Sequence, residues 1–269
     1  MIDLPRDTGT LVTVAGWRDL EEELELWEET GRVATLWWRD DDATVASGPL
    51  DRLLALADGV PLALAVIPAT AEAGLAWRLA RTPLVALLQH GWCHLDHATD
   101  RKKSEFPPGR PSDAVAADLV AGRARLGELF GATSLAVLAP PWNRFDDGFL
   151  PLLADCGIGA ISRVKPRPTA WPVPGVLAVN VHVDLVAWRG DRGFIGEEAA
   201  LGGIVEHLRG RRLDRFDCDE PTGILTHHLV QDERTAAFLA RLLAMTRGHR
   251  AARWLDAREA FAAAECNRA

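Results

Sequence analysis

The sequence contains no tyrosine, and its four cysteines form no C-x-x-C pair. Cys93, Cys156, Cys218 and Cys266 lie far apart, so the sequence predicts neither a disulfide framework nor a cysteine zinc site. An apolar stretch of about 18 residues is also missing, and the first residues are not a basic segment followed by an apolar one. From these absences we expect a cytoplasmic protein without a membrane span.

Positive charge is scarce as well. Thirty Lys and Arg residues against 38 Asp and Glu give a formal net charge of −8. A nucleic-acid-binding surface normally appears as a basic domain, so no nucleic-acid partner is expected. The content of 48% hydrophobic and 25% charged residues is ordinary for a globular protein and excludes disordered and fibrous chains. Without a linker or repeat, residues 1–269 predict a single domain, and a homo-oligomer remains open.

Short apolar runs alternate with amphipathic segments along the chain. Continuous apolar runs of four to six residues between helices are typical of buried parallel strands. About seven such units predict an α/β fold and favour a (β/α) barrel. The segment 17–30, before the first unit, is expected to form a helix packed on the outside of the barrel. The expected strands are 33–38, 62–67, 84–88, 135–138, 159–162, 177–181 and 223–226; the expected helices that follow are 49–57, 73–81, 112–130, 148–156, 197–208 and 233–245.

Two histidines follow the third apolar run, in His90-Gly-Trp-Cys-His94. If the segment turns helical there, both rings face the same way at i and i+4 and can hold one cation, for which imidazole suits zinc. An isolated pair of this kind is more often two ordinary surface or core histidines. Its position after a strand shifts the interpretation toward a metal.

Three consecutive carboxylates, Asp40, Asp41 and Asp42, follow the first apolar run. Adjacent carboxylates repel one another unless a cation, Arg39 or a helix N-terminus offsets their charge. One interpretation gives one Asp to a metal and another to general-base work. The alternative is a solvated loop whose last Asp caps the next helix.

Two further segments carry polar groups after a strand. Histidine titrates near neutrality, so His227 or His228 after the last apolar run can protonate a leaving group. The segment Ala139-Pro-Pro-Trp-Asn-Arg144 can present a backbone N–H to an oxyanion and an indole face to a substrate. A rigid Pro-Pro turn with a packed Trp142 is an equally good interpretation.

These segments, in this order, resemble the polysaccharide deacetylase (NodB-homology) family of carbohydrate esterases. The likeness spans residues 37–228. Asp41-Asp42-Ala43 resembles the first family motif, His90 to His94 the second, Pro140-Pro141-Trp142 the third, Asp184 with Trp188 the fourth, and Leu225-Thr226-His227 the fifth.

The resemblance implies a distorted (β/α) barrel and a metal-dependent deacetylase. It implies Asp42, His90 and His94 as ligands of a divalent metal, with zinc as the favoured ion. It implies Asp41 as the base that activates water, Trp142 N–H as an oxyanion donor and His227 as the general acid. The implied substrate is an N-acetylated sugar, as a small molecule or oligosaccharide, or a related amide. The triplet leaves a second register open, with Asp40 and Asp41 as base and ligand.

The chain departs from the family pattern at several positions. Ala139 replaces the third-motif arginine that tunes the base in the family, and Arg144 is near enough in sequence to substitute for it. Asp96 is a candidate acceptor for a metal-bound imidazole. Further residues expected to contact substrate or support the site are Asp40, Trp38, Trp92, His182, Asp184 and His228.

Two other functions stay open: a metal-independent hydrolase of a non-peptide C–N bond, and an inactive carbohydrate-binding protein on the same fold. Five of the ten tryptophans, Trp37, Trp38, Trp92, Trp142 and Trp188, lie in or beside the motifs, where an indole face suits a sugar ring. The basic loop 101–106 would overhang the same face and suit an acidic ligand, although a solvated surface loop is the commoner interpretation.

Overall fold

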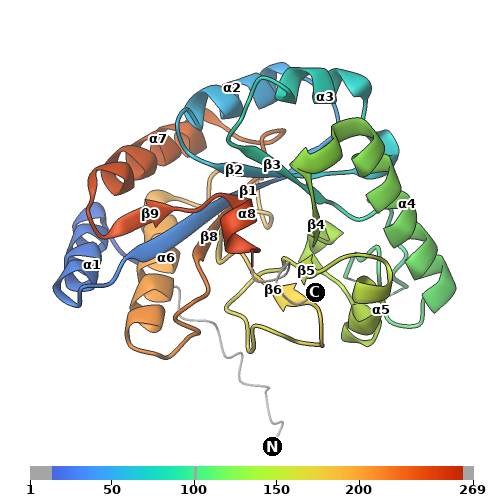
Figure 1. Cartoon of the computed structure of the whole chain (residues 1–269). Helices are drawn as coiled ribbons and strands as arrows, with labels where there is room; N and C mark the ends of the chain where they lie inside the picture. The colour runs from blue at the N-terminus through green and yellow to red at the C-terminus, as the bar shows by residue number, and fades with distance from the viewer. Residues whose placement is uncertain (1–13, 100–101, 263–269) are drawn as a thin grey trace, which may run out of the picture.

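The computed structural model describes residues 14–99 and 102–262, which form a curled parallel sheet surrounded by helices (Figure 1). The strand order is β6-β5-β4-β3-β2-β1-β8-β7, with β9 also paired to β1. The strands are β1 (Ala34–Ala43), β2 (Leu62–Val66), β3 (Val85–Gln89), β4 (Ser134–Leu138), β5 (Ala160–Ile161), β6 (Leu177–Ala178), β7 (Val183–Asp184), β8 (Thr222–Thr226) and β9 (Ala252–Trp254).

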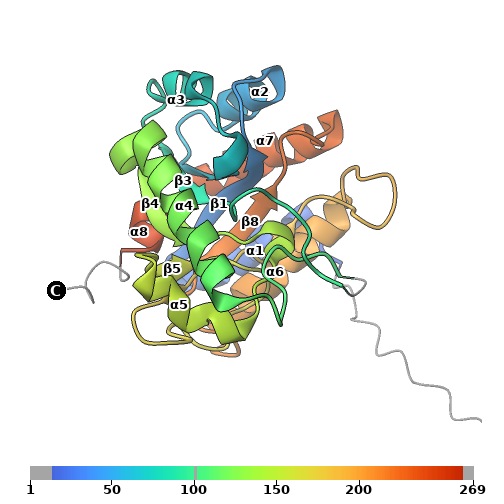
Figure 2. The ribbon, with the colours of Figure 1, turned by 90° about the vertical axis from the view of Figure 1, so that its right-hand side faces the viewer.

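Helices cover the outer face of the sheet (Figures 1 and 2). Helices lie between most successive strands, since each parallel crossover must return to the starting edge, whereas β5, β6 and β7 follow one another without an α-helix between them. The outer helices are α1 (Trp17–Glu29), α2 (Gly48–Leu56), α3 (Ala73–Leu79), α4 (Ser112–Phe130), α5 (Leu150–Asp155), α6 (Glu197–Arg212) and α7 (Glu233–Gly248). The short helix α8 (Ala257–Ala260) packs on the inner side. Helix α1 packs against α6 on the outside.

Strand β1 shows how the two faces of the sheet are filled. Successive side chains of a strand point to opposite faces. Leu36 and Trp38 lie in the cluster between sheet and helices, whereas Trp37 lies in the inner cluster with alanines of β2 and β3. The indole of Trp37 donates to the Asn180 carbonyl at 3.0 Å, and Phe261 after α8 packs edge-on against it. The inside of the sheet is therefore a packed core.

The predicted fold class is confirmed: the chain has a parallel α/β sheet curled into an incomplete barrel. In the described residues the sheet ends at β6 and β7, which do not pair with each other. The sequence patterns missed β7, β9 and α8, because elements of two to four residues carry no periodicity. No helix in ranges 14–99 and 102–262 is long and apolar enough to cross a bilayer.

Gly223 of β8 is a position where the fold leaves no room for a side chain. A Cβ there would lie 2.5 Å from Trp37 Nε1, 2.6 Å from the Asn180 oxygen and 2.7 Å from Val181 Cα. We expect Gly223→Ala to lower the free energy of unfolding by about 1–3 kcal/mol, because two of the three neighbours are backbone atoms that cannot turn away. Urea unfolding of the purified protein measures it.

The matched control is Gly127→Ala, the same substitution on α4, where nothing lies within 4 Å of the added Cβ. It should stabilise the protein by up to about 1 kcal/mol, since alanine is the better helix former. Equal effects of the two substitutions would contradict the packing described for β8.

Candidate active site

A bulge at the end of β1 arranges the three consecutive aspartates. The pairing of β1 with β2 is irregular between Asp40 and Ala43, and Asp42 has a left-handed backbone with φ of 73°. In a regular strand, Asp41 and Asp42 would point to opposite faces. The irregularity of the strand lets both reach one side, and β-bulges are commonly used near active sites in this way.

Asp42, His90 and His94 form a compact group at the C-terminal end of the strands. The Asp42 Oδ1 atom lies 3.1 Å from His90 Nε2 and 3.4 Å from His94 Nε2. All three donor atoms lie within 4.8 Å of one another. Burial lowers the pKa of His94, and the charge of His90 adds to this, so the ring favours the neutral form that binds metals.

This group fits a divalent metal. His90 Nδ1 lies 2.8 Å from the Ala139 carbonyl, which can only accept, so Nδ1 donates and Nε2 faces Asp42. Burial opposes a charged ring, but the carboxylates of Asp41 and Asp42 raise the pKa of His90, and a metal held here would take the place of a proton on Nε2. Asp42 Oδ1 is buried without a hydrogen-bond partner in the described residues. Ligand atoms about 2.1 Å from a tetrahedral zinc would be separated by about 3.4 Å, close to the separations found here.

Asp41 is held by an arginine from its own strand. Arg39 is fully buried and contacts the Asp41 carboxylate through two nitrogens, Nε to Oδ1 at 2.8 Å and Nη2 to Oδ2 at 3.0 Å. Its remaining donors bind the Ser162 carbonyl at 2.9 Å, the Ser162 hydroxyl at 2.7 Å and Asn143 Oδ1 at 2.5 Å. The guanidinium thus ties the ends of β1 and β5 to the turn after β4.

Asp40 points away from this group. Its carboxylate accepts from the Thr226 hydroxyl at 2.6 Å and pairs with His228 Nδ1 at 2.5 Å, and it is fully buried. Trp38 donates its indole N–H to the same Thr226 hydroxyl at 2.9 Å. Asp40 and Trp38 are therefore not available to touch a ligand, and of the roles expected for them only support of neighbouring residues remains.

A carboxylate and an imidazole, from Asp184 and His227, lie close together where β7 and β8 end side by side. Asp184 Oδ1 lies 3.9 Å from His227 Nδ1, and Trp188 donates its indole N–H to Asp184 Oδ2 at 2.7 Å. The Trp188 ring stands edge-on to His227 with centroids 4.7 Å apart. Burial raises the pKa of the Asp184 carboxyl, an effect that the charge of His227 partly offsets. The motif residues Asp184, Trp188 and His227 are thus in contact.

The predicted helical turn over His90 to His94 is wrong. The segment is an irregular loop in which Gly91 and His94 both have left-handed backbones. A Cβ on Gly91 would lie 1.8 Å from Glu105 Oε2, and the buried Glu105 carboxylate accepts the backbone N–H groups of Trp92 and Cys93. A buried carboxylate and a glycine, rather than helical spacing, bring the two histidines together.

Two supporting residues lie elsewhere than expected. Asp96 is exposed and accepts the backbone N–H groups of Ala98 and Ser104, each at 3.0 Å, whereas the acceptor for His90 is the Ala139 carbonyl. Arg144 donates to the Lys103 carbonyl at 2.7 Å and does not contact Asp41. The cation that faces Asp41 is Arg39.

Of the two tryptophans expected at the site, Trp142 packs against a candidate metal ligand, whereas Trp92 supports the loop that carries the histidines. Trp142, in the turn Pro141–Asn143, lies with its ring centroid 4.3 Å from that of His94, as expected of a residue at the site. Trp92 is partly buried, and its backbone holds the loop by accepting from Ala69 N–H at 2.9 Å.

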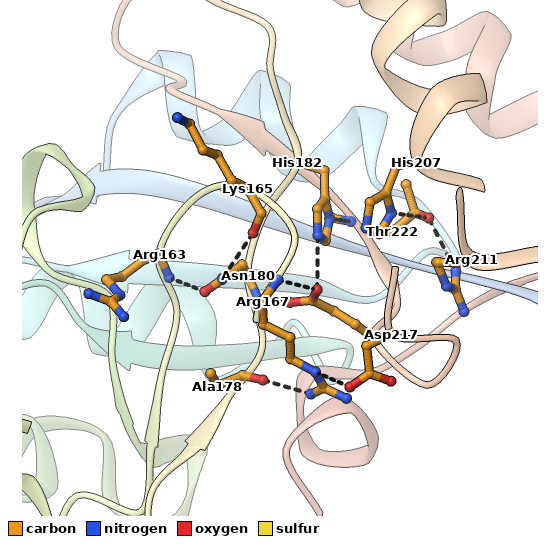
Figure 3. Close-up of polar contacts among 12 residues, drawn as sticks. Arg163, Lys165, Arg167, Ala178, Asn180, His182, His207, Arg211, Asp217 and Thr222 are labelled. Atoms are coloured by element: carbon orange, nitrogen blue, oxygen red, sulfur yellow. Dashed lines mark hydrogen bonds and ion pairs between the residues drawn. The ribbon is translucent and has the colours of Figure 1, made fainter. Parts of the chain in front are cut away.

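His182 lies at the opposite end of the sheet, which corrects its expected place near the substrate. Its N–H donates to the carbonyl of Gly223, early in β8, whereas His227 follows the end of that strand. Its ring stacks on His207 with centroids 3.3 Å apart, and its Nε2 lies 3.4 Å from buried Glu220 (Figure 3).

These three side chains do not form a second metal site, although their donor atoms are close together. Burial, with the charges of Arg211 and Arg167, lowers the pKa of His182 well below its ordinary value, so the ring is neutral. Gly223 N–H donates to its Nδ1 at 2.8 Å, which leaves the ring proton on Nε2. Stacked rings also cannot direct two in-plane lone pairs at one ion. The cluster instead joins α6 to the segments that precede β7 and β8.

Arg39, Glu105, Ser162 and Asn143 were missed as supporting residues. Arg39 stands beside the triplet and was considered only as one of several charges that offset it. Nothing in the sequence indicates that Glu105 would fill the space left by Gly91, since that contact exists only after the loop folds back.

We expect Arg39→Met to destabilise the protein by about 3–5 kcal/mol, because it leaves the Asp41 carboxylate buried without its cation. Arg144→Met should change the free energy of unfolding by no more than about 0.5 kcal/mol, since Arg144 is exposed. Denaturant unfolding of both variants checks this. A smaller cost of Arg39→Met in the Asp41→Asn background is also expected, and strict additivity would contradict the pairing.

No protein-family model and no curated protein sequence matches the chain. Solved structures do match over most of its length. A Mycobacterium smegmatis protein assigned to the polysaccharide deacetylases superposes with a TM-score of 0.59 at 18% identity, covering 88% of this chain and 91% of that one.

Two further structures are similar. A family 4 acetyl xylan esterase from Clostridium thermocellum, determined with a cobalt ion, has a TM-score of 0.53 at 15% identity, covering 87% of this chain and 96% of its own. A peptidoglycan N-acetylglucosamine deacetylase has a TM-score of 0.53 at 14% identity, covering 88% and 96%. The chain therefore has the polysaccharide deacetylase (NodB-like) fold that the order of its motifs predicted.

Proposed function

We propose that the protein is a metal-dependent hydrolase that removes the acetyl group from an N-acetylated sugar or a related amide. The observation that carries the proposal is the convergence of Asp42 Oδ1, His90 Nε2 and His94 Nε2, which lie within 4.8 Å of one another. A divalent cation between them would offset the carboxylate charge and accept the lone pairs of both imidazoles. The solved structures with this fold include a deacetylase and an esterase, which supports the same reaction class.

Asp42, His90 and His94 are the residues that would hold the metal, and zinc suits two imidazoles and a carboxylate. A divalent metal held there would supply Lewis acidity, lowering the pKa of water and polarising the substrate carbonyl. The cobalt ion in the acetyl xylan esterase structure supports a divalent ion on this fold.

The remaining steps fall to side chains of the chain itself. Asp41, fixed by Arg39, accepts the proton of the water that adds to the acetyl carbonyl. The backbone N–H of Trp142 donates to the oxyanion that this addition creates. His227, beside Asp184, gives a proton to the amine as the C–N bond breaks, so that acetate and a free amine leave.

The two alternative functions find less support in the geometry. The inactive-protein hypothesis rested on the missing third-motif arginine and the weak fourth motif. However, Arg39 holds the Asp41 carboxylate with two hydrogen bonds, and Trp188 contacts both Asp184 and His227. A metal-independent hydrolase would have no use for three ligand atoms converging within 4.8 Å. Both alternatives remain outcomes of the experiments below.

We expect the purified protein to bind about one divalent metal ion per chain, and His90→Ala to abolish this binding, because two ligands hold a metal far more weakly than three. His97→Ala is the matched control, since His97 lies in the same loop and is exposed. Elemental analysis after dialysis against zinc measures both. A well-folded wild-type protein that retains no metal would leave the metal-independent hydrolase as the better proposal.

Asp41→Asn should lower acetate release by about 10²–10⁴-fold, the usual contribution of a general base, while metal content stays at the wild-type level. An acetate assay on N-acetylated sugars, run beside elemental analysis, separates these effects. Unchanged glycan binding with no turnover in either wild type or Asp41→Asn would support the inactive binding protein.

A further inference from the structure

A groove of about 470 Å³ lies on the far side of the Trp142 turn from the candidate metal ligands. Its apolar part is formed by Phe106, Pro107 and Phe145, and its polar part includes Asn143 and Arg144. This volume is in the range of small-molecule sites. Neither the metal ligands nor Asp41 lines it, so the reaction proposed above does not account for it.

Asn143 connects the groove to the reacting centre. It lines the groove, and its Oδ1 accepts from Arg39 Nη2 at 2.5 Å, while Arg39 in turn holds Asp41. The adjacent Trp142 ring contacts His94. A ligand in the groove is therefore linked to the base through Asn143 and Arg39, and to a metal ligand through Asn143 and its neighbour Trp142.

The cations at the groove are the feature that selects its ligand. Arg144 is exposed and uses one nitrogen to bind the Lys103 carbonyl. Lys102 also lines the groove, and its side chain is exposed. Within the described parts of the chain, no carboxylate forms an ion pair with Arg144, although the protein carries a net charge of −8.

Other charges at the groove leave this excess in place. Arg163 also lines it and pairs with Asp147 at 2.7 Å, and the Asp147 side chain is 76% exposed. Asp146 is the one carboxylate among the described lining residues, and its Oδ1 accepts from Gly148 N–H at 3.0 Å. A cleft with an excess of one charge concentrates ligands of the opposite charge.

We propose that this groove is a subsite for an anionic group, a carboxylate or a phosphate, carried by the substrate whose acetyl group is removed. This proposal rests on the proposed function, because it places the anionic group on the substrate of that reaction. The binding itself does not require turnover. Arg144 presents the planar fork that carboxylates and phosphates share as a partner. Pro108, which is exposed, supplies an apolar surface for the uncharged part of the ligand.

The test compares charged and neutral ligands on the full chain by titration calorimetry. Glucose 6-phosphate and glucuronate are the charged probes, and glucose is the neutral partner of each. We expect at least about a tenfold preference for one charged probe over its partner, declining as salt is raised. The probe that shows it distinguishes a phosphate from a carboxylate. Equal binding within both pairs would overturn the proposal.

Variants locate the preference. Arg144→Gln should reduce it severalfold, Arg144→Lys should retain part of it, and Arg250→Gln, a change at an arginine 89% exposed on another surface, should leave it unchanged. A preference that survives Arg144→Gln but disappears in His90→Ala would place the anion on the metal ligands and overturn the subsite.

Acetate release separates this proposal from the proposed function. The expected result is a higher kcat/KM for N-acetylglucosamine 6-phosphate or N-acetylmuramic acid than for N-acetylglucosamine, lowered toward the neutral value by Arg144→Gln. Charge-dependent binding with no acetate release from any probe would overturn the deacetylase and keep the subsite. Acetate release with no charge preference in binding or in kcat/KM would do the reverse.

Discussion

The buried ion pair between Arg39 and Asp41 is the constraint on which the site depends. An arginine with no exposed surface is costly unless all its donors are satisfied, and here three different chain segments satisfy them. The same contacts fix Asp41, position Asn143 beside Trp142 and hold β5 near β1. A buried charge therefore specifies where the surrounding turns lie, and any rearrangement would leave a polar group unpaired.

The bulge at Asp42 lets the end of β1 supply both the Arg39–Asp41 ion pair and a candidate metal ligand. Arg39 and Asp41 follow the regular alternation of β1, whereas Asp42 leaves it with a positive φ and meets the two histidines. Strain of this kind is maintained only where the surroundings determine it. The base and a candidate metal ligand can thus be adjacent in sequence and still lie on the same side of the sheet.

The repeating pattern of the sequence was sufficient to predict the α/β class, the long helices and the central strands, because buried parallel strands read as continuous apolar runs. The order of Asp, His and Trp residues also predicted which groups meet at the strand ends. It could not predict the Arg39 pairing or the orientation of Asp40, since both depend on which face of β1 becomes the inner one. It could not predict the displacement of His182 either, because His182 precedes a strand of only two residues.

Strand β9 determines how late in synthesis the sheet can be completed. It pairs with the first half of β1, so that Ala34 is matched with Ala252, and α8 with Phe261 then covers Trp37. During synthesis the first residues of β1 keep an open edge until β9, more than 200 residues later in the sequence, has been made. Contacts so distant in sequence slow folding, and an open edge invites pairing with other chains. Pairing with β9 therefore removes the open edge at the start of β1.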